Sequence, residues 1–103
     1  MMDIARIIPY GRQKAISREM LSQLTGVSDR INRRAIERSR GKGNIIINLQ
    51  QGEGYFRIDP DDLQPGDLET ISRQYWANKH RALSILSYQK HLRAILKAHG
   101  MQV

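Results

Sequence analysis

One helix-length stretch of this sequence contains four arginines: Arg30, Arg33, Arg34 and Arg38. The guanidinium of arginine can form two parallel hydrogen bonds with the edge of guanine, and the amide of asparagine can do the same with adenine. Residues near the start of a recognition helix are the ones that reach base edges in the major groove. We therefore expect Arg30, Asn32 and Arg33 to read bases of double-stranded DNA.

Other residues around this stretch are suited to the phosphate backbone, whose contacts hold a protein on DNA without reading its sequence. Ser28 can cap the helix and offer its hydroxyl, together with the helix N-terminus, to a phosphate. The remaining candidates for phosphate contacts are cations: Arg34, Arg38, Arg40, Lys42 and Arg57. The alternative interpretation is an ordinary basic helix surface in solvent.

The spacing of apolar residues predicts three helices that would position these side chains. The first covers residues 3–8, the second follows a cap at Ser17 and ends near Leu24, and the third runs from Ser28 to about Arg40. Gly26 supplies the left-handed backbone that a tight turn between the second and third helices requires.

The orientation of the third helix decides which of its residues face outward. Val27, Ile31 and Ala35 are spaced four residues apart, and we expect them to form its buried face, with Ile36 beside them. Asn32 and Arg33 would then face solvent or DNA. The alternative is a half-buried Asn32 whose amide is satisfied by a backbone group.

A β-hairpin is predicted after the third helix. Residues 44–49 are rich in β-branched side chains, residues 55–58 form a second candidate strand, and the glycine-containing segment 50–54 joins them. The joining segment contains no cation and one carboxylate, Glu53. Whether the hairpin contacts DNA or only covers the core with Ile45, Ile47 and Phe56 is therefore left open.

The residues around the turn resemble a known motif. Leu21-Ser22, followed by Gly26-Val27-Ser28, is similar to the helix-turn-helix core in which a Leu-Ala pair packs the second helix, Gly makes the turn and Val-Ser opens the recognition helix. Two residues depart from that pattern: Ser22 replaces the small Ala, and Asn32 replaces an apolar residue six positions after the glycine.

The resemblance extends over most of the chain. With Arg33-Arg34-Ala35-Ile36-Glu37, the hairpin ending Gly54-Tyr55-Phe56 and the later pattern Arg81-Ala82-Leu83-Ser84-Ile85-Leu86, the sequence resembles small winged-helix proteins of phage and mobile-element origin in Gram-positive bacteria. This resemblance implies a mainly α fold with a small β-hairpin, a winged helix-turn-helix domain followed by a long C-terminal helix, and DNA binding.

Charge divides the 103-residue chain into three parts. Lysine and arginine number 17 against 10 acidic residues, which gives a net charge of +7, typical of nucleic-acid-binding proteins. Residues 1–58 hold 11 basic and 5 acidic residues, 59–69 hold 5 acidic and no basic residues, and 70–103 hold 6 basic and no acidic residues. We expect a winged helix-turn-helix domain at 1–58, an acidic linker rich in Pro and Gly at 59–66, and a helical extension at 67–103.

The extension has apolar residues spaced three and four apart from Leu68 to Leu96, with polar interruptions at Asn78 and Gln89. This spacing approximates the seam of a coiled coil, in which polar residues fix the register. We expect a homodimer through this helix, because helix-turn-helix proteins commonly read two half-sites. The alternative is a helix folded back within a monomer.

No residue pattern predicts catalysis, a metal or a cofactor. The chain has no cysteine, and His80, His91 and His99 lack the spacing of a helical metal pair. Asp59-Pro60-Asp61-Asp62 lacks the glycine and glutamate of a calcium loop. Neither an export signal nor a membrane span is evident, and no small-molecule ligand is indicated. A cytoplasmic protein that is not an enzyme is expected.

These observations lead to one function and two alternatives. The leading hypothesis is sequence-specific binding of double-stranded DNA by residues 28–40, in a transcriptional regulator or a phage-type accessory factor. The first alternative is an adaptor that binds proteins in a phage replication or packaging complex. RNA binding ranks third, because Tyr55 and Phe56 are expected inside the hairpin and not on a stacking platform.

Overall fold

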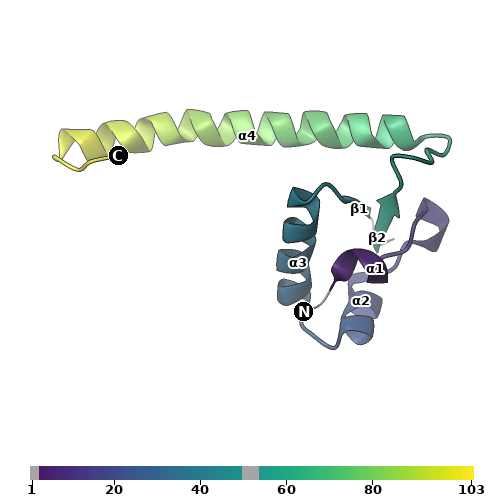
Figure 1. Cartoon of the computed structure of the whole chain (residues 1–103). Coiled ribbons are helices and arrows are strands. Elements are labelled where there is room, and N and C mark those ends of the chain that lie inside the picture. Colours follow the sequence, from purple (N-terminus) through teal and green to yellow (C-terminus); the bar gives the residue numbers. More distant parts are fainter. Residues whose placement is uncertain (1–2, 50–53) are drawn as a thin grey trace. The chain divides into compact units, whose positions relative to one another are not determined.

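The computed structural model describes residues 3–49 and 54–103, which form two compact units that divide between Gln64 and Pro65 (Figure 1). The first contains four helical segments and a two-stranded antiparallel hairpin, and the second contains one long helix. The prediction of a mainly α fold with a small hairpin and a long C-terminal helix is therefore confirmed.

The first unit begins with three short helical segments, α1 (Ile4–Ile7), η1 (Arg12–Lys14) and α2 (Arg18–Thr25). Helix α3 (Asp29–Gly41) and strands β1 (Ile45–Leu49) and β2 (Gly54–Ile58) complete it. This is the order of elements expected for a winged helix-turn-helix domain. The segment between the two strands, which contains Glu53, lies outside the described residues.

Local chemistry fixes the ends of α2 and α3. The Ser17 hydroxyl accepts a hydrogen bond from the Met20 amide at 3.0 Å, and the Ser28 hydroxyl accepts one from the Ile31 amide at 3.4 Å, so both predicted caps are confirmed. Gly26 ends α2 with φ 74° and donates its amide hydrogen to the Ser22 carbonyl. The turn between the two helices therefore uses the left-handed conformation that glycine tolerates best.

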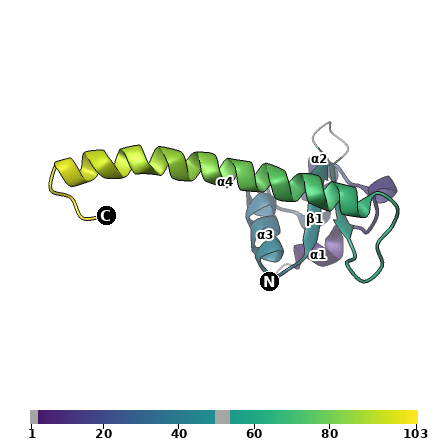
Figure 2. The same cartoon turned by 90° about the horizontal axis from the view of Figure 1, so that it is seen from above.

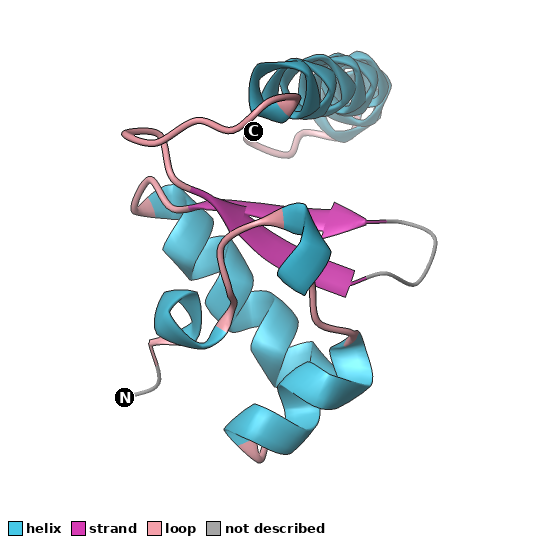
Figure 3. Ribbon diagram, turned by 90° about the vertical axis from the view of Figure 1, so that its right-hand side faces the viewer, coloured by secondary structure: helices cyan, strands magenta, loops and turns pink. Residues whose placement is uncertain are grey.

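The hairpin is joined to the segments on either side of η1 (Figure 3). Ile16 pairs antiparallel with Tyr55 through two backbone hydrogen bonds of 2.9 and 2.7 Å, and Tyr10 pairs with Arg57 in a parallel bridge. A Cβ atom on Gly54 would overlap the Ile16 carbonyl oxygen, and Gly54 has φ +94°. Glycine at this position is therefore needed both for its conformation and for the close approach of two backbones.

A core cluster of apolar residues joins the helices of the first unit to its hairpin. It contains Ile4, Ile8, Leu21, Ala35, Ile36, Ile46 and Tyr55. Ile46 and Tyr55 join this cluster, whereas the expected Ile47 and Phe56 form a cross-strand pair that is buried on the other face of the hairpin. Neighbouring residues of a strand point to opposite faces, which explains the difference.

The second unit consists of helix α4 (Asp67–Ala98), which runs without interruption for 32 residues (Figure 2). At 1.5 Å per residue its length is about 48 Å. None of its residues is buried. Within the described residues, no helix is long and apolar enough to cross a membrane.

Candidate nucleic-acid interface

The buried face of α3 differs from the one that its apolar spacing predicted. Asn32 is only 1% exposed, whereas Ile31 is 46% exposed. The buried residues of this helix are Asn32, Ala35, Ile36 and Ser39. The expected stripe through Ile31 is therefore wrong, and so is the expectation that Asn32 faces the major groove.

Asn32 is buried because its amide bonds on both sides to hydroxyl groups of the preceding helix. Its Nδ2 donates to the Ser22 Oγ at 3.2 Å, and its Oδ1 accepts from the Thr25 Oγ1 at 3.0 Å. The Thr25 hydroxyl also accepts a weaker bond of 3.4 Å from the Val27 amide in the turn. This network replaces the water that a buried amide would lose, so a polar residue can occupy a core position. The partners are side chains, not the backbone group considered from sequence.

The two departures from the helix-turn-helix pattern are thus one feature. Ser22 stands where the pattern has Ala, and Asn32 stands where it has an apolar residue, and these two side chains bond to each other across the turn. In the sequence, Ser22 and Asn32 are two separate departures from the helix-turn-helix pattern. Their pairing was the signal that would have fixed the orientation of α3.

The corrected orientation changes which arginines lie at the centre of the outer face. Arg30 and Arg34 lie two residues before and two residues after the buried Asn32, about 200° around the helix in each direction. Both are exposed. Glu37 lies two residues after buried Ala35 and two residues before buried Ser39, so it also faces outward. Arg34, expected to contact phosphate, is therefore a central residue of the surface that α3 presents.

Arg33 lies nearer the side of α3 and has an ionic partner. Its Nε is 3.1 Å from the Oδ2 of Asp29, one turn earlier, and the Arg33 side chain remains 60% exposed. The other carboxylate oxygen of Asp29 is buried and accepts no hydrogen bond within the described part of the chain. An exposed pair of this kind contributes only about 0–1 kcal/mol. Arg33 can therefore exchange Asp29 for another anionic or acceptor group at little cost.

Arg40, expected to contact phosphate, is exposed but already has a hydrogen-bond partner within the first unit. Its Nε and Nη2 both donate to the Ile46 carbonyl, at 3.0 and 2.8 Å. Burial lowers the pKa of the Arg40 guanidinium from its ordinary value, while the charges of Tyr55 and Glu37 raise it. Arg40 therefore ties the end of α3 to β1, and a phosphate contact by this residue would be an additional role.

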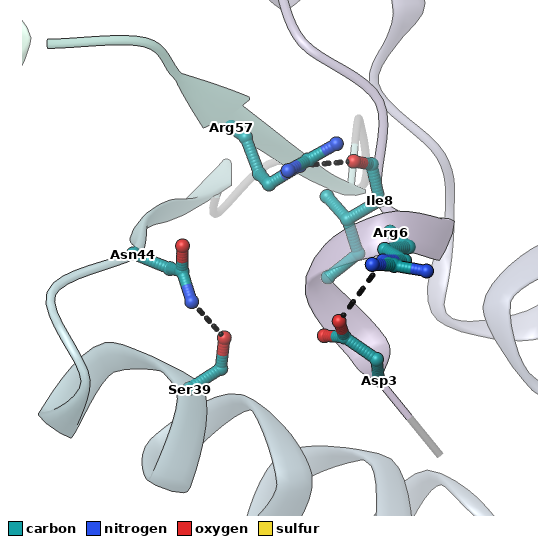
Figure 4. Close-up of polar contacts among 6 residues, drawn as sticks. All are labelled: Asp3, Arg6, Ile8, Ser39, Asn44 and Arg57. Atoms are coloured by element: carbon teal, nitrogen blue, oxygen red, sulfur yellow. Dashed lines mark hydrogen bonds and ion pairs between the residues drawn. The ribbon is translucent and has the colours of Figure 1, made fainter.

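Arg57, the other arginine expected to bind phosphate near the hairpin, is held in a similar way. Its Nε donates to the Ile8 carbonyl (Figure 4). Its guanidinium also lies 3.9 Å from the centre of the Tyr10 ring. The contact joins β2 to the segment after α1. Figure 4 also shows the Asn44 amide donating to the Ser39 hydroxyl, which fastens the chain just after α3. Both arginines were selected for their charge, whereas their partners are carbonyl oxygens.

The remaining predicted phosphate contacts are accessible. Ser28 is exposed at the start of α3, and Arg38 and Lys42 are exposed near its end. Arg38 lies on the flank opposite Arg33, because it follows buried Ile36 by two residues and precedes buried Ser39 by one. The surface formed by Arg30, Arg33, Arg34, Glu37 and Arg38 is called the α3 outer face below.

Neither a cluster of metal ligands nor a similar protein of known function helps to assign a role to the α3 outer face. Residues 3–49 and 54–103 contain no group of three or more His, Cys, Asp or Glu side chains that could hold a metal ion. Comparison of the sequence with protein-family models found no match, and neither the curated proteins nor the solved structures yielded a significant match.

Proposed function

We propose that this protein binds double-stranded DNA in a sequence-specific manner through the α3 outer face, as a cytoplasmic transcriptional regulator or phage-type accessory factor. It would act by occupying its site, without chemistry. The observation that supports the proposal most strongly is the orientation of α3, which directs Arg30 and Arg34 outward from successive turns while Asn32 anchors the opposite side.

The proposed roles follow from the positions of the arginines along α3. Arg30 is in the first turn, where a recognition helix approaches base edges most closely, and Arg34 follows one turn later. Both can make bidentate hydrogen bonds to guanine. Arg33 can join them by leaving Asp29. Ser28, Arg38 and Lys42 are proposed to hold phosphates on either side of the groove.

Glu37 gives the surface a means of discrimination. A carboxylate on the outer face would repel phosphates, but it can accept a hydrogen bond from the N4 amino group of cytosine. A surface meant only for non-specific attraction to DNA would be better served by a neutral or basic residue. Glu37 therefore favours sequence-specific binding over general binding to a polyanion.

The test begins with selection of bound sequences from a random duplex pool. On the selected site, Arg30→Ala and Arg34→Ala should each cost about 1–3 kcal/mol of binding free energy, with much smaller effects on unrelated duplexes. Arg38→Ala is the matched control. It should weaken all sequences alike and reduce the slope of log K against log salt by about 0.9. Equal losses on every duplex for all three variants would contradict the assignment of base readers.

The adaptor function remains the second candidate because α4 exposes large apolar side chains, among them Trp76, Leu83 and Leu86. A protein-binding role predicts that the random pool yields no enriched sequence. It also predicts that variants of the α3 outer face leave partner binding unchanged.

A further inference from the structure

Helix α4 carries a continuous seam of residues spaced alternately three and four apart. The seam runs from Leu68 through Ile71, Tyr75, Asn78 and Ala82, and then through Ile85, Gln89 and Leu92 to Leu96. A straight α-helix has 3.6 residues per turn, so a stripe with period 3.5 drifts by about 20° in each group of seven residues. Over four groups of seven residues, the stripe can keep facing one partner only if α4 supercoils around another helix. The seam therefore indicates a helical occupant.

The seam is available for such a partner. Leu68 is 68% exposed and Ile85 is 57% exposed, and no residue of α4 is buried. The cations of α4 lie beside the seam or behind it, and none occupies a seam position. A mostly apolar line of this length that is left exposed is typical of a surface that pairs.

The spacing of the seam allows a second copy that runs in the opposite direction. From Asn78 toward the N-terminus the seam steps back by three and then four residues, and from Gln89 toward the C-terminus it advances by three and then four. Two antiparallel copies therefore match when Asn78 of one faces Gln89 of the other. In that register the small Ala82 faces the large Ile85, and Ile71 faces Leu96.

The distribution of charge also favours opposite directions. Asp67 and Glu69 lie at the start of α4, and every charged residue from 70 onward is basic. In an antiparallel pair, the acidic start of each helix lies level with Lys97 near the basic end of the other. A parallel pair would place like charges side by side at both ends. Opposed helix dipoles add to the same preference.

Beside the seam, the antiparallel register brings no cation against another cation. On the two flanks of the seam, Lys79 neighbours Leu86 of the second copy and Arg81 neighbours Tyr88, each pair within about two residues of level. The apolar stems of Lys79 and Arg81 can cover those side chains while their charges remain in water. We infer that α4 forms an antiparallel, two-stranded coiled coil with a second copy of this chain, centred between Leu83 and Ser84.

This dimer does not depend on DNA binding, but it gives the proposed function a geometry. The N-termini of the two α4 helices would lie about 50 Å apart, at opposite ends of the coiled coil. In each copy the segment 59–66, which joins β2 to α4, can span at most about 26 Å. If the first unit binds DNA, this two-fold arrangement predicts inverted half-sites separated by one or two helical turns.

The test uses the full chain without DNA and exploits the absence of cysteine. Sedimentation equilibrium should show a dimer. Ile71→Cys and Leu96→Cys chains should form a disulfide-linked dimer when they are mixed under oxidising conditions. Either variant alone should not, because its two cysteines would be about 38 Å apart and a disulfide requires Cα atoms within about 7 Å.

Ala94→Cys mixed with Ile71→Cys is the control, because position 94 is at nearly the same level but faces away from the seam. It should give no linked dimer. A monomer in sedimentation, or linkage of either variant with itself, would overturn the inference. The absence of an enriched DNA sequence would refute the proposed function alone and leave the dimer standing.

Discussion

Substitution of Asn32 by alanine should destabilise the first unit severely, although the residue contributes no apolar surface to the core. The change removes hydrogen bonds of 3.2 and 3.0 Å and leaves the hydroxyls of Ser22 and Thr25 without this partner. Leaving a buried polar group unsatisfied costs about 1–3 kcal/mol. Both hydroxyls are only partly buried and can recover some hydration, so we expect about 2–4 kcal/mol in total. A unit of this size has about 3–10 kcal/mol of stability.

A double-mutant cycle separates the hydrogen bond from the loss of volume. Ser22→Ala alone should cost less than Asn32→Ala, because Asn32 keeps its bond to Thr25. The Ser22→Ala/Asn32→Ala double variant should cost clearly less than the sum of the two single variants, by about 1 kcal/mol or more, because the second change removes a group that is already unpaired.

The assay must report on the first unit alone. Tryptophan fluorescence is unsuitable, because the single tryptophan is Trp76 in α4. Hydrogen exchange of the Leu21 and Asn32 backbone amides, which donate to the carbonyls of Ser17 and Ser28, follows opening of α2 and α3 directly. A cost below about 0.5 kcal/mol for the position-32 variant, or additive effects in the cycle, would refute this account of why α3 is oriented as it is.

Two further predictions concern contacts that join the hairpin to the rest of the first unit. Gly54→Ala should cost more than about 3 kcal/mol of unfolding free energy in urea denaturation, because its Cβ would overlap the Ile16 carbonyl. Gly43→Ala is the control, because Gly43 has a similar φ of +99° but open space around it. It should cost only about 1–2 kcal/mol. Arg40→Lys keeps the charge but cannot donate two hydrogen bonds to the Ile46 carbonyl in the same geometry. Thermal unfolding should therefore show a loss of about 1–2 kcal/mol of unfolding free energy. An unchanged melting temperature would show that these bonds contribute little.

Much of the fold could be predicted because its signals are local. Ser17 and Ser28 cap helices through bonds to amides three residues later, and Gly26 ends α2 through its own backbone conformation. Each signal depends only on residues within one turn of the chain. The same holds for α4, whose 32 residues contain neither glycine nor proline.

The orientation of α3 could not be predicted in this way. Val27, Ile31 and Ala35 form a stripe as regular as the true one, so periodicity alone cannot choose between the two faces. The choice depends on bonds from Asn32 to residues seven and ten positions away. Such bonds exist only after α2 and α3 have packed together, which is why apolar spacing favoured the wrong face.

The arginines of the first unit show why net charge is a coarse guide to a nucleic-acid surface. Arg40 and Arg57 each donate to a backbone carbonyl, and Arg33 is paired with Asp29, so part of the positive charge already has a use within the fold. A guanidinium that is held by the fold has fewer donors left for DNA, but it is also fixed in place. Arg30 and Arg34 have no such partner among residues 3–49 and 54–103, so under the proposed function ordering them on DNA would cost side-chain entropy that contacts to bases or phosphates must offset. Sequence preference should depend on these two residues, while general affinity is spread over the cations at the ends of α3.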